Sequence, residues 1–462
     1  MAESLIISVS GMRGVIGENL TPVIAAQYGC AFGTFLRDAA AGEGRRLRVC
    51  VGRDSRVSGQ MLLSAMTAGL CSVGVDVIDL GLVTTPCVGI MLRELGCDGG
   101  IVVTASHNPL PYNGIKLLLS NGMAPPAPTA ARIKQAFLDG QARYVGSVHC
   151  GIVSRNDDTD RVHVDKVLAT IDAKRIGTRR LRIVLDSVNG AGARVAKKLL
   201  AELGCEVVAM NEEPTGLFAH GAEPVAANLG DLCRRVRQEK ADLGFAQDPD
   251  ADRLAIVDEN GVYIGEEYTL ALAAEYVFSK QGGTAAANLS TSRMIDDIAA
   301  RAGSKVLRTP VGEAHVANAM IEHGCVIGGE GNGGVIDLRV GPIRDSLVGM
   351  ALVLQLMAET GKSVSGLVAK IGGYSMHKDK FSADSQQAQE ILRRSAERFS
   401  NADVNTADGL RLDFPDAWVH LRTSNTEPVM RIIVEAKDDP TAQRYIQAVS
   451  EIRQAVMAGA VG

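Results

Sequence analysis

The sequence lacks the features that mark nucleic-acid-binding, secreted and membrane-spanning proteins. Its formal charge of −5 over 462 residues gives no basic surface for nucleic acid. Its start has no basic segment followed by an apolar segment and a small-residue cleavage site. Its longest apolar run, 347–354, is far too short to span a bilayer. We therefore expect a soluble, cytoplasmic protein without nucleic-acid or membrane partners.

Aromatic residues are scarce, at 4% of the chain, so the cores should be aliphatic and a ligand site should depend little on aromatic stacking. The nine cysteines are an odd number, are scattered from Cys30 to Cys325 and include no CxxC pair. Disulfide frameworks are typical of small secreted chains, so these cysteines are expected to be reduced thiols. An anionic substrate would have to be bound by a local cluster of positive charge, because the net charge is negative.

The sequence does contain a strand–loop–helix–strand pattern that occurs three times. Each unit should add neighbouring parallel strands to a sheet, joined by a right-handed crossover. Repetition of the pattern indicates three related α/β domains. A helix over 21–36, with Thr21 as N-cap and Pro22 at the first position, precedes the first unit. The elements are expected at 47–51, 59–73 and 75–80; at 181–186, to 203 and at 206–210; and at 284–289, to 302 and at 305–308.

The last stretch of the chain has no glycine-rich turn between a strand and a helix. It shows strands such as 418–422 and 430–435 and two helices, so it should be a smaller domain. The predicted fold is thus α/β: three related mixed α/β domains of βαβ type plus a smaller C-terminal α+β domain, around a central cleft. The predicted boundaries are 1–154, 155–255, 256–371 and 372–462. Both a monomer and a homodimer are compatible with the sequence.

An acidic loop, DPDADR (248–253), lies between the predicted strands 242–246 and 254–257. In an extended loop the carboxylates of Asp248, Asp250 and Asp252 would point to one side and repel one another unless a cation neutralised them. Ligation by oxygen alone suits Mg²⁺ or Ca²⁺. An EF-hand is a weaker interpretation, because Arg253 takes the place of the invariant glycine. A solvated turn without a metal is the remaining alternative.

A second polar loop, TASHNP (104–109), follows the predicted strand 100–103. Loops at the carboxyl ends of strands form the ligand crevice of open α/β sheets, so Ser106 lies where chemistry tends to occur. Its hydroxyl has His107 beside it and flexible backbone donors around it. The alternatives are a plain polar turn and a Ser-His-Asp triad, although the G-x-S-x-G elbow is absent.

Two further clusters have the composition of a phosphosugar site. The GEGNGG loop (329–334) offers a carboxylate and an amide, which suit vicinal sugar hydroxyls. The RTSNTEP loop (422–428), with Arg431 on the next strand, combines two guanidinium groups with hydroxyl and amide donors. Such a combination suits a phosphate group. Either cluster could also be an ordinary turn.

In their order and spacing, the TASHNP, DPDADR, GEGNGG and RTSNTEP loops, with the opening SVSGMRG (8–14), resemble the α-D-phosphohexomutase family over essentially the whole chain. The resemblance implies that Ser106 carries a phosphoryl group and that this phosphate and the three aspartates of the acidic loop bind one Mg²⁺ ion. The boundaries above then enclose a phosphoserine, a metal-binding, a sugar-binding and a phosphate-binding domain. The resemblance also implies that Arg13, His107 and Lys116 line the reacting end, with Lys116 as a candidate general acid or base, and that Arg253 lies beside the metal loop. Glu330 and Asn332 would hold the sugar hydroxyls. The distal phosphate would be bound by Arg422, Ser424, Asn425, Thr426 and Arg431.

The implied reaction interconverts a hexose 6-phosphate and a hexose 1-phosphate. The two oxygens lie too far apart for direct transfer, so the phosphoserine donates to one end and makes a 1,6-bisphosphosugar, the intermediate and activator. This intermediate must turn over before Ser106 takes back the other phosphate, and a mobile C-terminal domain would let it do so. A cation would offset charge on the transferring group.

The choice of sugar depends on the GEGNGG loop, which lacks the histidine found in the best-known members of the family. Gly-Asn-Gly-Gly loops occur in members assigned as phosphoglucosamine mutases, which favours glucosamine 6-phosphate as substrate. A dual phosphoglucomutase/phosphomannomutase is the alternative. The segment 341–345 also departs from the usual Gly-Arg-Asp run. A phosphoserine-type phosphatase is a weaker interpretation, because it usually needs more than one metal ion and the acidic loop supplies ligands for a single one. A non-catalytic sugar-phosphate sensor is also weaker, because Ser106, Asp248, Asp250 and Asp252 are all intact.

Overall fold

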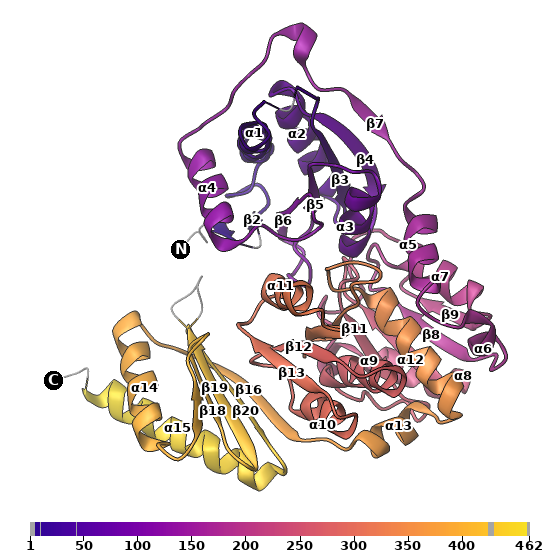
Figure 1. Cartoon of the computed structure of the whole chain (residues 1–462), viewed down its shortest axis with the longest axis vertical. Helices are drawn as coiled ribbons and strands as arrows, with labels where there is room; N and C mark the ends of the chain where they lie inside the picture. The colour runs from indigo at the N-terminus through magenta and orange to yellow at the C-terminus, as the bar shows by residue number, and fades with distance from the viewer. Residues whose placement is uncertain (1–4, 10, 43, 424–428, 460–462) are drawn as a thin grey trace.

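The computed structural model describes residues 5–9, 11–42, 44–423 and 429–459. The chain folds into four domains, each with its own sheet, which lie in an arc from the N-terminal domain to the C-terminal one (Figure 1). The four-domain α/β prediction is confirmed. The first domain contains β1 (Ile6–Ser8), β2 (Gly11–Val15), α1 (Pro22–Ala39), β3 (Arg48–Arg53), α2 (Gly59–Ser72), β4 (Asp76–Leu82), α3 (Thr85–Glu94), β5 (Gly99–Val103), β6 (Tyr112–Leu119), α4 (Ala127–Leu138), the 3-10 helix η1 (Ser147–His149) and β7 (Val153–Arg155).

The second and third domains each have a four-stranded sheet. The second contains α5 (Thr159–Leu168), α6 (Ala173–Gly177), β8 (Arg182–Asp186), α7 (Ala193–Glu202), β9 (Glu206–Met210), the 3-10 helix η2 (Ala226–Asn228), α8 (Gly230–Glu239), β10 (Leu243–Gln247) and β11 (Leu254–Val257). The third contains α9 (Glu267–Lys280), β12 (Thr284–Asn288), α10 (Met294–Arg301), β13 (Lys305–Thr309), α11 (Glu313–His323), β14 (Ile327–Glu330), β15 (Gly334–Ile336), α12 (Ser346–Thr360) and α13 (Val364–Ile371).

Within its described residues, the fourth domain is a five-stranded antiparallel sheet with two helices, as predicted for an α+β domain. Its strand order is β16-β20-β19-β18-β17. Its elements are β16 (Ser375–Ser382), α14 (Ser385–Arg398), β17 (Asp403–Asn405), β18 (Leu410–Asp413), β19 (Ala417–Thr423), β20 (Val429–Ala436) and α15 (Asp439–Gly459).

One strand order is shared by the first three domains. Their sheets contain β6-β5-β3-β4, β11-β10-β8-β9 and β15-β14-β12-β13 in corresponding positions. Counted along the chain, the first three of these strands are parallel in each domain, and the fourth is antiparallel to the third. The predicted relation between the three domains is therefore confirmed. The antiparallel fourth strand is a departure from the purely parallel βαβ pattern, and it turns the link between strands three and four into a hairpin.

The hairpin loops between the third and fourth strands are three of the four polar loops singled out in the sequence. They are the serine loop (104–111) between β5 and β6, the metal loop (248–253) between β10 and β11, and the sugar loop (331–333) between β14 and β15. Because all three occupy the same place in a repeated sheet, packing the sheets with these ends together brings the loops together.

An apolar core runs through the first three domains. It includes Val102 of β5, Leu185 of β8 and Ala287 of β12, together with nearly all of α12. The fourth domain has a separate core around Leu412 and Val434. No single helix among the described residues is long and apolar enough to cross a membrane, whereas α12 and α13 taken together meet that test but are bent by 89°.

The fourth domain lies beside the third (Figure 1), and polar contacts join the two. The Arg293 guanidinium donates to the carbonyls of Phe414 and Ala417, both at 3.0 Å. The Arg293 amide donates to the buried Glu435 carboxylate at 2.9 Å. His420 is fully buried and its Nδ1 lies 2.9 Å from the Ser290 hydroxyl. These contacts fix how the two domains meet without merging their cores.

Local sequence signals explain several element boundaries. The Thr21 hydroxyl accepts from the Ile24 amide and Pro22 opens α1, as predicted. Gly11 begins β2 with φ of 100°, and a Cβ there would lie 2.1 Å from the Ile115 carbonyl oxygen. All nine cysteines lie within the described residues and are free, which confirms the prediction of thiols.

Candidate active site

The serine loop holds Ser106 in an uncommon backbone conformation. Its φ is 49°, in the left-handed region that non-glycine residues rarely adopt. The Ser106 amide donates to the Thr104 hydroxyl at 2.8 Å, which closes a tight turn directly after β5. The Ser106 hydroxyl donates to the Asp248 carboxylate at 3.0 Å. Two loops that are 142 residues apart in the sequence therefore meet at the serine oxygen.

His107 lies beside this oxygen, with its Nδ1 at 3.4 Å from the Ser106 Oγ. Burial and the nearby Arg253 and Arg13 charges lower the pKa of His107 to about 3, so the imidazole is neutral near pH 7. A Ser-His-Asp triad is not what the serine loop forms, because Ser106 donates directly to an aspartate and its neighbouring histidine lies at a long distance.

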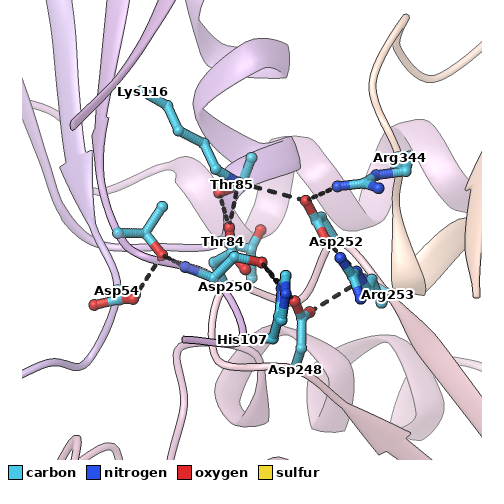
Figure 2. A network of polar contacts seen from close by, with 12 residues as sticks. Asp54, Thr84, Thr85, His107, Lys116, Asp248, Asp250, Asp252, Arg253 and Arg344 are labelled. Atoms are coloured by element: carbon cyan, nitrogen blue, oxygen red, sulfur yellow. Dashed lines mark hydrogen bonds and ion pairs between the residues drawn. The ribbon is translucent and has the colours of Figure 1, made fainter. Parts of the chain in front are cut away.

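The metal loop brings three fully buried carboxylates together (Figure 2). Oxygens of Asp248, Asp250 and Asp252 lie within 4.8 Å of one another. The expectation of an extended loop is wrong: Ala251 has φ of 56° and its amide donates to the Asp248 carbonyl at 2.9 Å, which makes a turn. The carboxylates converge because the backbone curls around them, rather than by alternation along a strand.

This carboxylate group suits a hard cation. Burial, followed by the charges of Asp252 and Asp250, raises the pKa of Asp248 well above its usual range. The Asp250 Oδ1 and the Asp252 Oδ1 are buried without a hydrogen-bond partner among the described residues. Buried carboxylate oxygens without donors are costly unless a cation is bound, and oxygen ligands are those that Mg²⁺ and Ca²⁺ prefer. The residues therefore fit a divalent metal ion.

Cationic side chains surround the carboxylates (Figure 2). The Lys116 ammonium lies 2.7 Å from Asp250 and 3.5 Å from Asp252. Burial alone would lower the pKa of Lys116, but the charges of these two aspartates outweigh burial, so the pKa is raised. The Arg253 amide donates to Asp248 at 3.1 Å, so this residue does lie beside the metal loop. Arg13 donates to the Asn108 side chain of the serine loop at 3.1 Å.

The β2–β6 pairing explains why Arg13 and Lys116 face the same place. Arg13 pairs with Gly114, two residues before Lys116, so both side chains leave the same face of the sheet. A Cβ on Gly114 would lie 2.7 Å from the Thr104 carbonyl oxygen. Glycine at this position thus lets β6 pass close under the start of the serine loop.

The sugar loop is connected to the metal loop through Arg344, a residue that motif analysis did not select. Its guanidinium donates to Asp252 at 2.7 Å and to Glu330 at 2.6 Å, and it also pairs with Glu313 at 3.2 Å. Glu330 is buried and also accepts from the Asn288 amide nitrogen at 2.7 Å. Arg344 falls in the segment 341–345 that departs from the family's usual run, and that departure was the signal available for it.

Asn332 lies beside Glu330 and is partly exposed. Its side-chain oxygen accepts from the Gly334 amide at 3.3 Å, which turns the sugar loop back toward β15. The Gly333 carbonyl accepts from the Leu254 amide at 3.0 Å, directly after the metal loop. The metal and sugar loops therefore lie against each other.

The predicted phosphate loop lies partly outside the described residues, which exclude Ser424, Asn425 and Thr426. Arg422 and Arg431 flank this loop and are paired across β19 and β20, and Arg431 is paired with Lys380 of β16. Three cations thus form a row across the sheet. Like charges directly opposite one another are destabilising, so the row suits an anionic ligand. Arg422 pairs with Asp408 at 3.2 Å.

Thr85 was also missed from the sequence. Its hydroxyl donates to Asp250 at 2.6 Å and its amide donates to the Asp250 carbonyl at 2.9 Å. Thr85 opens α3 after β4, whose carboxyl end faces the same edge of the sheet as that of β5. Its place after a parallel strand was the usable signal.

Comparison with known proteins decides the family. The four family models described as phosphoglucomutase/phosphomannomutase domains I, II and III and C-terminal domain match residues 5–143, 161–261, 265–374 and 379–452. The chain is 40% identical to a phosphoglucomutase/phosphomannomutase of Thermococcus kodakarensis, covering 95% of this chain and 96% of that one. The chain belongs to the phosphoglucomutase/phosphomannomutase family. Its members are phosphohexomutases, a class of isomerases, and this chain is an enzyme of that class.

Other phosphohexomutases match over almost the whole chain. A probable phosphoglucosamine mutase of Methanopyrus kandleri is 39% identical and covers 94% of each chain. The crystal structure of a phosphoglucomutase/phosphomannomutase family protein from Burkholderia thailandensis superposes with a TM-score of 0.86 at 30% identity, covering 98% of this chain and 99% of that one. The chain is thus similar both to a phosphoglucomutase/phosphomannomutase and to probable phosphoglucosamine mutases. The relatives agree on the family and differ in the hexose that their names give.

Proposed function

We propose that this phosphohexomutase interconverts a hexose 6-phosphate and a hexose 1-phosphate through a phosphoserine at Ser106 and a 1,6-bisphosphosugar intermediate. The observation that carries the proposal is the 3.0 Å contact between the Ser106 Oγ and Asp248, a member of the buried aspartate group. A phosphate on this oxygen would project from a fixed turn into a place already lined by metal-type carboxylates and by cations.

The reacting end would be formed by Lys116, His107 and Arg13. In the first half-reaction a sugar hydroxyl oxygen bonds to phosphorus, the bond from phosphorus to the Ser106 Oγ breaks, and a proton must pass from the sugar hydroxyl to the enzyme. Lys116, protonated beside Asp250 and Asp252, would act as a general acid: it would give its proton to the leaving Ser106 oxygen and regain one from the sugar hydroxyl. Neutral His107, 3.4 Å from the oxygen, would orient it, and Arg13 would bind phosphate.

One Mg²⁺ ion is the proposed cofactor, held by Asp248, Asp250, Asp252 and the phosphate on Ser106. When bound, it offsets negative charge on the transferring phosphoryl group and on the serine oxygen. Arg253 and Arg344 bind to the aspartates from outside and would keep them in place.

The two ends of the substrate would be bound by different domains. Glu330 and Asn332 would hold sugar hydroxyls, and Arg422, Ser424, Asn425, Thr426 and Arg431 would hold the distal phosphate. The row of Lys380, Arg431 and Arg422 supports an anion site there. We propose the boundaries 1–154, 155–255, 256–371 and 372–462 for the phosphoserine, metal-binding, sugar-binding and phosphate-binding domains. Nine free thiols agree with a cytoplasmic location.

For the hexose we propose glucosamine, with glucose and mannose phosphates as the alternative. The Gly-Asn-Gly-Gly loop and the many relatives named as probable phosphoglucosamine mutases support glucosamine. The relative named as a phosphoglucomutase/phosphomannomutase supports the alternative.

A coupled assay with glucosamine 6-phosphate, glucose 1-phosphate and mannose 1-phosphate, each with its bisphosphate activator, tests the choice. We expect the highest kcat/KM for glucosamine 6-phosphate; if it ranks last, the glucosamine assignment is wrong. The same assay with the Ser106→Ala variant should show no turnover. Release of inorganic phosphate in place of the isomeric sugar phosphate would point to a phosphatase.

A further inference from the structure

Arg56 lies beneath the serine loop and is the most extensively bonded arginine near it. Its side chain is 2% exposed. One terminal nitrogen donates to the carbonyls of Ser106 and Asn108, both at 2.6 Å. The other donates to the carbonyls of Pro109 and Tyr112, both at 3.1 Å. One guanidinium therefore donates to four carbonyl oxygens, three in the serine loop and one in the first residue of β6.

Asp54 connects Arg56 to the Ser106 amide by way of Thr104. Its carboxylate is fully buried, accepts from the Arg56 side chain at 3.2 Å and amide at 2.9 Å, and accepts from the Thr104 hydroxyl at 2.7 Å. That hydroxyl in turn accepts from the Ser106 amide. Both backbone polar groups of Ser106 are thus tied to the Asp54–Arg56 pair, the carbonyl through Arg56 and the amide through Thr104.

This double tie matters because the backbone of Ser106 is strained. A non-glycine residue with φ of 49° persists where the surrounding structure over-determines it. The Ser106 hydroxyl points toward Asp248, at 3.0 Å. Relaxation of φ would turn the side chain away from this direction. The contacts that oppose such relaxation are the Arg56 bond to the Ser106 carbonyl and the Thr104 bond to the Ser106 amide.

The second domain also contacts the Arg56 guanidinium. The ring of Phe218 lies over the guanidinium, with 4.9 Å from Cζ to the ring centroid. Phe218 belongs to the cover segment, residues 211–225, in which His220 is anchored to Asp186 at 3.1 Å. In the same segment Glu223 accepts from the metal-loop residue Arg253 at 2.9 Å. The cover segment therefore touches the support of the serine loop and the flank of the metal loop.

Gly216 shows that this approach is close. A Cβ on Gly216 would lie 2.2 Å from the Ser55 carbonyl oxygen, and its φ is 69°. The cover segment can reach the backbone next to Arg56 because this position has no side chain.

We propose that Arg56 is a positioning residue that holds the Ser106 oxygen in line with the aspartate group, and that Phe218 clamps Arg56 so that the serine and metal loops keep a fixed relation. The inference rests on the proposed role of Ser106 in phosphoryl transfer. Arg56 touches neither sugar nor phosphate in this account; it acts through the backbone of the serine loop.

The clamp is tested with Phe218→Leu, which keeps an apolar side chain but removes the ring face. The matched control is Phe35→Leu, because Phe35 also lies under an arginine, Arg132 at 5.3 Å, in the contact between α1 and α4. We expect Phe218→Leu to lower kcat and the single-turnover rate of phosphate transfer from Ser106 about threefold to tenfold, with KM within about twofold of wild type. Phe35→Leu should leave both rates unchanged.

The positioning role itself is tested with Arg56→Met and Arg56→Lys. Misplacement of a reacting group by about 1 Å costs about 100-fold in rate, which is the loss of kcat expected for Arg56→Met. Arg56→Lys keeps the charge beside Asp54 but cannot reach four carbonyls, so an intermediate kcat is expected. If Arg56→Met does not fold, Phe218→Leu and Arg56→Lys still decide the matter.

A purely structural role would lower the thermal midpoint and leave the kcat of the folded enzyme unchanged. That pattern in Phe218→Leu and Arg56→Lys would overturn the inference. The outcome is separable from failure of the proposed function: turnover by Ser106→Ala would reject both, whereas an inactive Ser106→Ala with fully active Phe218 and Arg56 variants would reject the positioning role alone.

Discussion

Replacement of Arg344 by methionine should uncouple the metal loop from the sugar loop. Methionine keeps much of the apolar stem but removes the guanidinium, whose two hydrogen bonds reach Asp252 at 2.7 Å and Glu330 at 2.6 Å. Both of these carboxylates are buried. The change therefore leaves two buried charges without their shared partner.

The size of the effect follows from these contacts. A hydrogen bond to a charged group contributes about 1.5–3 kcal/mol, so two of them set an upper range of about 3–6 kcal/mol. Removal of one partner from a buried ion pair costs about 3–5 kcal/mol. We expect Arg344→Met to lose about 3–5 kcal/mol of stability and at least about tenfold in kcat/KM, which corresponds to about 1.4 kcal/mol.

The assay measures the midpoint of thermal unfolding with and without Mg²⁺ and then the steady-state turnover of the enzyme. The control is Arg161→Met, because Arg161 also pairs with two aspartates, Asp158 and Asp165 at 3.3 Å, but is 58% exposed. Its loss should cost no more than about 1 kcal/mol. Added Mg²⁺ should recover part of the Arg344 loss, since a cation offsets charge on Asp252. Equal midpoints and equal turnover in the two variants would refute the reasoning.

Three further predictions concern the metal, the domain interface and the distal phosphate. Mg²⁺ at about 100 times its Kd should stabilise the wild type by about 2.7 kcal/mol, and Asp250→Asn should lose most of this gain; a midpoint insensitive to chelation would exclude the metal site. Burial lowers the pKa of His420 from 6.5 to about 4. Below pH 6.5 the unfolded state binds a proton that the folded state does not, so stability should fall by up to about 3 kcal/mol as the pH drops to 4. His420→Gln should flatten this slope in acid denaturation, and an unchanged slope would mean that another group causes it. Lys380→Met should raise KM at least about threefold with little change in kcat; an unchanged KM would remove Lys380 from the phosphate site.

The repeated βαβ pattern was readable from the sequence because each strand, glycine-rich turn and helix is specified by residues close together. The strand order was not readable, because pairing partners such as β5 and β3 are far apart in the chain. The extended acidic loop was a wrong expectation for a related reason. Ala251 adopts a left-handed φ of 56° that alanine does not favour on its own, and its turn is held by contacts such as the Ser346 amide to the Ala251 carbonyl.

The candidate site divides in the same way. Ser106 and the three aspartates lie in compact loops whose composition indicates their chemistry. Thr85 and Arg344 contact the aspartates from positions 165 and 92 residues away. The place of Thr85 after a strand and the departure of segment 341–345 from the family's usual run mark these positions, but neither signal names the distant carboxylate that each side chain contacts, so the folded chain was needed to find the partners.

Transfer of one phosphate from Ser106 to a sugar tests the central claim most directly. Protein isolated in its phosphorylated form is mixed with one equivalent of a hexose phosphate, and the intact mass and the Ser106 peptide are followed during a single turnover. The account predicts that the protein loses the mass of one phosphate from Ser106 while an equal amount of hexose bisphosphate appears. Conversion of the hexose phosphate to its isomer while the phosphate stays on Ser106 throughout, with no hexose bisphosphate formed, would contradict it.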